Sequence, residues 1–134
     1  MGGELKATFC LVRDGQAILS QHIGDLENAA ALDDYRAMLR LYRDLFDFTP
    51  AVIAVDAHPD YLSTTLGAAL AQECGARLVP VGHHHAHMAA CLVDGGIGLA
   101  DGAEGAVGLI LDGLGLGADG TLWGARFCAG GIAA

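Results

Sequence analysis

Three short apolar runs, each followed by polar side chains, constrain the fold of this chain more than any other feature. The runs cover residues 51–55, 76–81 and 106–111, and they lead to Asp56, to a histidine cluster and to Asp112, respectively. Each run is short enough to be a buried strand, and helical patterns separate them. The sequence therefore predicts an α/β layer in which helices pack on a mixed sheet. Ligands of such sheets collect at the carboxyl ends of the strands, where these polar residues are expected to lie.

A hairpin and a long helix are predicted before the first run. Residues 8–12 and 16–21 are two β-like segments around an Asp-Gly turn, which is typical of a tight hairpin. From about Asn28 onward, apolar residues recur every three or four positions, which predicts an amphipathic helix that ends before Pro50. Its expected buried stripe consists of Leu32, Tyr35, Leu39, Tyr42 and Phe46.

Capping and turn residues predict the remaining connections. Ser63 or Asp60 can cap the helix that follows the first apolar run. A flexible acidic loop is expected between residues 94 and 105. After the last apolar run we expect a second hairpin, with its turn at residues 119–120 and residues 121–127 as the returning strand.

Size and charge narrow the classes of function. With 134 residues, of which 53% are hydrophobic, the chain can build the core of a single domain. Sixteen acidic against seven basic residues give a net charge of −9, and Lys6 is the only lysine. A chain of this charge is poorly suited to neutralising a phosphate backbone, which argues against direct binding of nucleic acid.

The sequence predicts neither a membrane span nor a secretion signal. No apolar run reaches the ~20 residues that a membrane-spanning helix needs. Residues 1–6 lack the basic and apolar regions of a signal peptide. We therefore expect a cytoplasmic protein that does not bind a membrane.

The four cysteines are predicted to be reduced core residues. They form no CxxC pair, so neither a zinc knuckle nor a disulfide framework is indicated. Cys91 differs from the others because it follows His87 by one helical turn, on the same face of the predicted helix.

Four of the six histidines lie within five positions, at the start of a helix predicted to run to about Val93. His83 and His87 are four residues apart and therefore on one helical face, a spacing that lets two imidazoles bind one metal ion. His84 and His85 are expected to point elsewhere. The start of the helix is also suited to an anion. The alternative is a polar helix start that happens to be rich in histidine.

Asp112 is the third candidate metal ligand. It follows a predicted strand and precedes glycines that let a ligand approach the backbone, so it can bind a divalent ion or hold a metal-bound water near a triphosphate. The alternative is an ordinary Asp-Gly turn. Gly113 and Gly115 are candidate cofactor-binding residues, although this run lacks the lysine and the helix of a P-loop.

Three further polar residues are open to more than one interpretation. His58 can orient a substrate or bond to the backbone at the exit of a strand. His22 and Asp25 are best explained as turn and cap residues, and the sequence leaves their roles open.

Five ordered segments resemble the HypF family, the carbamoyltransferases of NiFe-hydrogenase maturation. They are residues 5–11 (LKATFCL), 20–26 (SQHIGDL), 58–64 (HPDYLST), 83–87 (HHHAH) and 111–124 (LDGLGLGADGTLWG). Together they extend over nearly the whole chain. The part resembled is the first lobe of the Kae1-like domain of this family.

The resemblance implies a fold and a division of the chain. The fold is a ribonuclease-H-like mixed sheet with flanking helices, as one lobe of the actin, sugar-kinase and Hsp70 superfamily. Residues 1–105 would form this first lobe, and residues 106–134 the opening hairpin of a truncated second lobe. We expect such a fragment to be inactive alone, and its exposed apolar surface to promote self-association.

The resemblance also implies a reaction and its components. Carbamoyl phosphate and ATP would yield carbamoyl adenylate, whose carbamoyl group is then moved to the C-terminal cysteine of the partner HypE for the cyanide ligands of the hydrogenase. His83 and His87 match the metal-binding histidines of the family, and Asp112 matches a metal-ligating aspartate of related O-carbamoyltransferases. The resemblance does not distinguish iron, zinc and magnesium. ATP or carbamoyl adenylate would be the bound nucleotide.

Two other functions remain open at this point. A threonylcarbamoyl transferase that modifies tRNA would have the same fold, but the acidic charge and the HHHAH and HPDYLST segments disfavour it. A non-enzymatic α/β interaction module with a structural histidine cluster is the second alternative. Metal binding by the histidines distinguishes that module from both enzymes.

Overall fold

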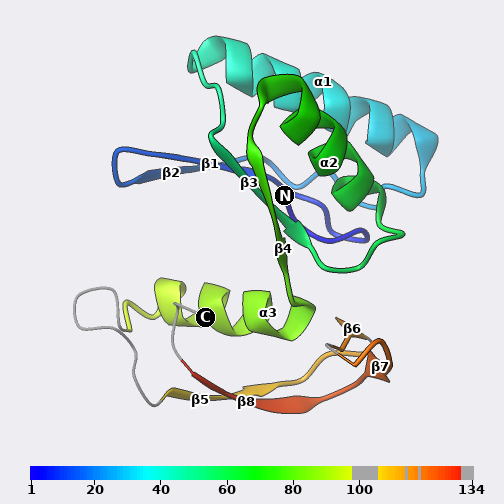
Figure 1. Cartoon of the computed structure of the whole chain (residues 1–134), viewed down its shortest axis with the longest axis vertical. Helices are drawn as coiled ribbons and strands as arrows, with labels where there is room; N and C mark the ends of the chain where they lie inside the picture. The colour runs from blue at the N-terminus through cyan, green and yellow to red at the C-terminus, as the bar shows by residue number, and fades with distance from the viewer. Residues whose placement is uncertain (98–105, 114, 118, 131–134) are drawn as a thin grey trace. The chain divides into compact units, whose positions relative to one another are not determined.

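The computed structural model describes residues 1–97, 106–113, 115–117 and 119–130 (Figure 1). The chain divides into two compact units, Met1–Pro80 and Val81–Ala134. Most of the predicted acidic loop, residues 98–105, lies outside the described residues. The predicted boundary between two lobes at residue 105 stays a prediction.

The first unit begins with the predicted hairpin. Strands β1 (Cys10–Arg13) and β2 (Gln16–Leu19) are antiparallel, with Arg13 opposite Gln16. The two turn residues, Asp14 and Gly15, have φ angles of 52° and 76°. Two positive φ angles are typical of the type I′ turn, whose twist matches that of the paired strands. The Asp-Gly signal was therefore a correct guide to the hairpin.

Helix α1 (Ala29–Leu45) packs its apolar stripe against the core of this unit. Asn28 caps it, since its Oδ1 accepts hydrogen bonds from the amides of Ala30 and Ala31 at 2.9 and 3.4 Å. The predicted stripe is confirmed: Tyr35 is fully buried, and the partly buried Leu32, Leu39, Tyr42 and Phe46 pack against the same core. Phe9 contacts the rings of Tyr35 and Tyr42 edge to face, with centroids 5.6 and 5.1 Å away.

Helix α2 (Leu62–Cys74) packs Leu62 and Leu66 against the same core as α1 (Figure 1), and it is capped from a distant part of the chain. The amide of Leu62 donates to Oε2 of Glu4 at 2.9 Å. The predicted cap, Ser63 or Asp60, is wrong, because Tyr61 occupies the cap position, from which its side chain does not bond to the helix amides, and Ser63 is buried. Burial raises the pKa of Glu4, and the Ser63 and Leu62 amides oppose that shift.

Strands β3 (Val52–Asp56) and β4 (Arg77–Val81) are hydrogen-bonded neighbours. The expectation that β3 is buried on both sides is wrong: Ile53 and Val55 are buried, whereas Val52 is 48% exposed. The strand therefore buries one face only, and the period of two decides which residues enter the core.

In the second unit, helix α3 (His83–Asp94) covers one face of the sheet formed by β5 (Ala106–Ile110) and β8 (Arg126–Gly130) (Figure 1). The two strands are antiparallel. The small core between helix and sheet consists of Met88, Leu92, Ile110, Ala106 and Cys128.

The predicted second hairpin is present, but its returning strand is broken. Strands β6 (Gly115–Leu116) and β7 (Leu122–Trp123) pair around the expected turn, and β8 then returns along β5. Gly124 and Ala125 separate the two pieces. The single predicted strand over residues 121–127 therefore becomes two short strands in different sheets.

Three further observations concern the chain as a whole. Among the described residues, the strands form four two-stranded sheets. No helix in the described ranges combines the length and apolarity needed to cross a membrane. All four cysteines are free, as predicted; the prediction that they are core residues is wrong for Cys10 and Cys91, which are exposed, whereas the half-buried Cys128 packs against the core of the second unit. Cys10 and Cys91 lie on outward-facing positions of a strand and a helix, respectively.

Candidate metal centre

The first turn of α3 places two imidazoles side by side. His83 is the first residue of the helix, and His87 follows one turn later. Their ring centroids are 4.9 Å apart, with an angle of 77° between the ring planes. The predicted pairing of these side chains on one helical face is therefore present in the structure.

Strand β5 delivers Asp112 to the same place. Ile110, at the end of the strand, is buried against Met88 and Leu92 of α3, and this contact sets the position of the chain two residues later. Nε2 of His83 lies 3.1 Å from Oδ2 of Asp112. One ligand atom each from His83, His87 and Asp112 lies within 4.8 Å of the other two.

The two oxygens of Asp112 have different surroundings. Oδ1 accepts a hydrogen bond from the amide of Gly113 at 2.7 Å. Oδ2 is buried and accepts no hydrogen bond from a described residue, although an imidazole nitrogen is close to it. Ligand atoms around one metal ion are about 3.0–3.4 Å apart, given metal–ligand bonds of about 2.0–2.1 Å. The separation of 3.1 Å between these two atoms is compatible with two ligands of the same ion, and it is also the distance of an ion pair between an imidazolium and a carboxylate.

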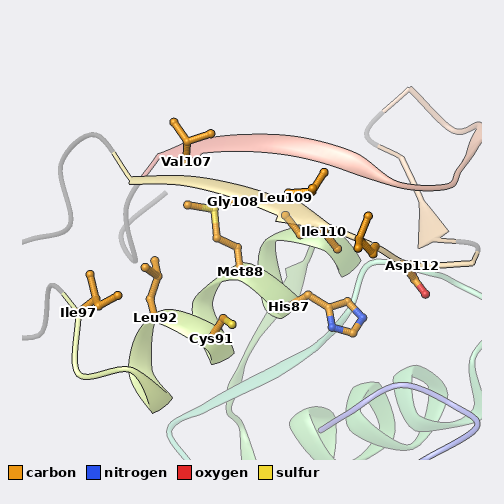
Figure 2. Close-up of a pocket in the computed structure, with 11 residues that line it drawn as sticks. His87, Met88, Cys91, Leu92, Ile97, Val107, Gly108, Leu109, Ile110 and Asp112 are labelled. Carbon is orange, nitrogen blue, oxygen red and sulfur yellow. The ribbon is translucent and has the colours of Figure 1, made fainter.

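A cavity of about 370 Å³ adjoins these residues (Figure 2). Its walls come from α3, from Ile97 beyond the helix, and from residues 107–112. His87 and Asp112 lie at one end, and Ile97 lies at the other (Figure 2). Cys91 lines the cavity but does not belong to the group of three candidate ligands. The cavity is thus mainly apolar, with its polar groups at the candidate metal centre.

The two candidate cofactor-binding glycines differ in their surroundings. Gly113 is exposed, and a β-carbon added there would have no atom within 4 Å. Gly115 is buried, and a β-carbon there would lie 2.6 Å from Cε1 of His84. The open space beside Gly113 leaves its backbone accessible to a ligand, whereas Gly115 makes room for a neighbouring ring. Contact of either glycine with a nucleotide stays a prediction.

The turn of the β6–β7 hairpin is held by Asp119. Its Oδ1 accepts hydrogen bonds from the backbone amide of Thr121 at 3.0 Å and from the hydroxyl at 2.8 Å. These bonds, the backbone one first, lower the pKa of the Asp119 carboxyl. The carboxylate of Asp119 therefore stabilises the turn by accepting both bonds.

In the first unit, Asp56, the last residue of β3, and His58 accept hydrogen bonds from nearby backbone amides. Oδ1 of Asp56 accepts from the amide of His58 at 2.8 Å, and Nδ1 of His58 accepts from the amide of Asp60 at 3.3 Å. His58 also stacks on Tyr61, with centroids 4.3 Å apart. This geometry supports the backbone-bonding interpretation of His58.

Asp25 also has a local role, since its Oδ1 accepts a hydrogen bond from the amide of Glu27 at 2.9 Å, just before α1. This bond agrees with the interpretation of Asp25 as a turn residue. That the polar residues after β3 share an edge with the histidine cluster stays a prediction.

Sequence reasoning missed His84. It is 4% exposed, and its Nε2 lies 3.1 Å from the carbonyl oxygen of Gly124. A signal was present: His84, Met88 and Leu92 follow one another at intervals of four, and all three are buried on one face of α3. A histidine in line with two apolar residues indicates a core-facing ring.

Comparisons with known proteins agree with these features. Residues 1–94 match the family model described as HypF Kae1-like domain. The chain is 45% identical over 129 residues to the carbamoyltransferase HypF of Rhodobacter capsulatus, covering 96% of this chain and 17% of that protein. The chain thus spans about a sixth of the length of this relative.

Two solved structures are similar over almost the whole chain. The crystal structure of full-length HypF in the phosphate- and nucleotide-bound form has a TM-score of 0.83 at 37% identity, covering 96% of this chain and 16% of that one. The T. kodakarensis HypF structure has a TM-score of 0.86 at 30% identity, covering 97% and 16%, respectively. These similarities confirm the predicted α/β fold class. The chain belongs to the HypF family of carbamoyltransferases.

Proposed function

We propose that this chain supplies a metal- and nucleotide-binding part of a carbamoyltransferase that acts in hydrogenase maturation. The observation that carries the proposal is the convergence of His83, His87 and Asp112, with one Asp112 oxygen buried and without a hydrogen bond. A buried carboxylate oxygen without a donor is costly unless a cation satisfies it. Membership of a carbamoyltransferase family supports the type of reaction.

The donor set favours certain metals. Two imidazoles and one carboxylate suit Zn(II) or Fe(II), whereas Mg(II) prefers a set made of oxygen atoms. A set of three protein ligands leaves coordination positions for an outside oxygen. When bound, the ion would act as a Lewis acid toward a phosphate group of the nucleotide.

The protein residues would have separate tasks in this site. His83 and His87 would hold the ion from one helical turn, and Asp112 would add a negative charge from the end of β5. The exposed backbone of Gly113, next to Asp112, would approach the phosphate. The phosphate and nucleotide named for a solved relative support such a ligand. The apolar wall of the adjoining cavity would limit the access of water to the reacting group.

We further propose the substrates that the family resemblance implies. ATP, carbamoyl phosphate and water would yield carbamoyl adenylate with release of pyrophosphate and inorganic phosphate. The C-terminal cysteine thiol of a HypE-type partner would then attack the carbamoyl carbon, forming a C–S bond as the bond to the AMP oxygen breaks and the thiol proton is lost. The product would be a thiocarboxamide on the partner.

Metal binding is tested by titrating the purified chain with Zn(II), Fe(II) and Mg(II) in a calorimeter. We expect Zn(II) and Fe(II) to bind more tightly than Mg(II), and His83→Ala, His87→Ala or Asp112→Asn to weaken Zn(II) at least 100-fold. His85→Ala is the matched control, since it removes a neighbouring imidazole outside the group, and it should change the affinity less than threefold. Equal affinity in all these variants would refute the metal centre.

Carbamoyl transfer is tested in a complete carbamoyltransferase that carries this segment. With ATP, carbamoyl phosphate and the HypE-type partner, we expect mass spectrometry to detect a carbamoyl group on the partner's C-terminal cysteine. His83→Ala and His87→Ala should abolish this product. Unchanged transfer in both variants would contradict the proposed role of the histidines.

A further inference from the structure

His84 joins the first turn of α3 to the hairpin β6–β7. Its ring is almost fully buried, and its Nε2 lies 3.1 Å from the carbonyl oxygen of Gly124, 40 residues along the chain. A carbonyl oxygen only accepts hydrogen bonds, so Nε2 must carry the hydrogen. Because the donor is buried, losing this bond would leave a polar group unsatisfied.

The glycine at position 115 lets the ring approach this closely. A β-carbon there would lie 2.6 Å from Cε1 of His84 and 3.0 Å from Cδ2 of His83. Gly115 lies opposite Trp123 in the hairpin. The indole is also near His84, with ring centroids 5.9 Å apart. His84, Gly115 and Trp123 therefore pack as one layer next to His83.

This layer determines where β6 and the preceding Gly113 lie relative to the candidate metal ligands. Gly115 meets both histidine rings, and Gly113 is only two residues away in the chain. Gly113 in turn donates its amide to Asp112. A shift of β6 away from α3 would therefore displace Gly113, and with it the carboxylate of Asp112.

We propose that His84 is a positioning residue: its hydrogen bond to Gly124 holds β6 and Gly113 in place, so that the Gly113 backbone and the metal ligands contact the same phosphate group. The inference rests on the proposed function, because the phosphate belongs to the nucleotide proposed there. His84 acts through the position of the backbone and holds neither metal nor phosphate itself.

The test compares His84→Gln with His84→Asn. The glutamine amide nitrogen reaches the position of the imidazole Nε2, whereas that of asparagine, shorter by one methylene, does not. Each variant is loaded with Zn(II) and titrated with inorganic pyrophosphate, by calorimetry and by the emission of Trp123, the only tryptophan of the chain. We expect Zn(II) affinity within threefold of wild type in both. Pyrophosphate affinity should fall at least tenfold in His84→Asn and stay within threefold in His84→Gln.

Controls separate the inference from the proposed function. His85→Asn makes the same change one residue later and should leave both affinities unchanged. If His84→Asn does not fold by circular dichroism, His84→Ala replaces it, because alanine also lacks a donor for the Gly124 carbonyl, and should cause the same loss. Equal pyrophosphate affinity in the asparagine and glutamine variants, or none in the zinc-loaded wild type, would overturn the inference. Absence of Zn(II) binding by the wild type would instead refute the proposed metal centre.

Discussion

The two compact units of the chain fill their interiors with different kinds of residues. In the first unit, Phe9, Leu26 and Tyr35 form a buried core around which many other apolar side chains pack. Among the described residues of the second unit, the apolar core contains three buried ones, Met88, Leu92 and Ile110. Beside that core, a buried histidine packs against glycines and a tryptophan.

This difference teaches how stability and chemistry are divided along the chain. Aromatic and aliphatic packing gives a large stabilisation that does not depend on precise polar geometry. Buried imidazoles and carboxylates stabilise a fold only when every polar atom has a partner. The first unit is therefore expected to owe its stability to burial, and the second to owe part of it to hydrogen bonds and ligands.

The largest expected effect on stability comes from replacing one large core residue of each unit by alanine. Phe9→Ala should destabilise the first unit by about 3–5 kcal/mol, and Met88→Ala the second by about 2 kcal/mol, because the smaller core can relax further. All three tyrosines lie in the first unit and the tryptophan in the second, so tyrosine and tryptophan emission during urea unfolding report the units separately. An equal loss in both units would contradict the comparison.

An intermediate effect is expected from an unsatisfied hydroxyl group in the core of the first unit. The Tyr35 hydroxyl is buried and has no hydrogen-bond partner among the described residues, and burial raises its pKa. Tyr35→Phe removes this unsatisfied group and keeps the ring contacts with Phe9, so it should stabilise the first unit by about 1 kcal/mol. The shift in the urea midpoint measures this gain. A loss of stability would indicate that the hydroxyl has a partner after all.

The smallest expected effect concerns the carboxylate that caps α2. Because the pKa of Glu4 is raised on folding, its contribution to stability is present below the ordinary value of 4.5 and is lost as the pH rises through the folded-state value. Glu4→Gln keeps an acceptor for the Leu62 amide without the buried charge. It should therefore stabilise the chain by a few tenths of a kcal/mol at about pH 7, and this gain should vanish below pH 4.5.

The control for this prediction is Glu4→Ala, which removes the acceptor and should cost about 1 kcal/mol at neutral pH, as the loss of a helix cap does. Thermal unfolding across the pH range measures both variants. A gain for Glu4→Gln that does not change with pH would show that the buried charge is not its cause.

Local patterns in the sequence were sufficient for the hairpin, for the buried stripe of α1 and for the pairing of His83 with His87. Each of these depends on residues close together in the chain, where the period of a helix or the φ angles of a turn decide the outcome. The family resemblance was also recognisable from ordered segments, and the comparisons confirm it.

Only the tertiary structure decided which distant groups meet. Three contacts join residues that are far apart in the sequence. Asp112 lies beside His83, 29 positions away; Glu4 caps α2 at Leu62, 58 positions away; and His84 bonds to Gly124, 40 positions away. No local period encodes such contacts, because they follow from how whole helices and strands pack. The sequence by itself therefore determined the candidate ligands, and the packing of α3 on β5 decided that the carboxylate lies beside the imidazoles.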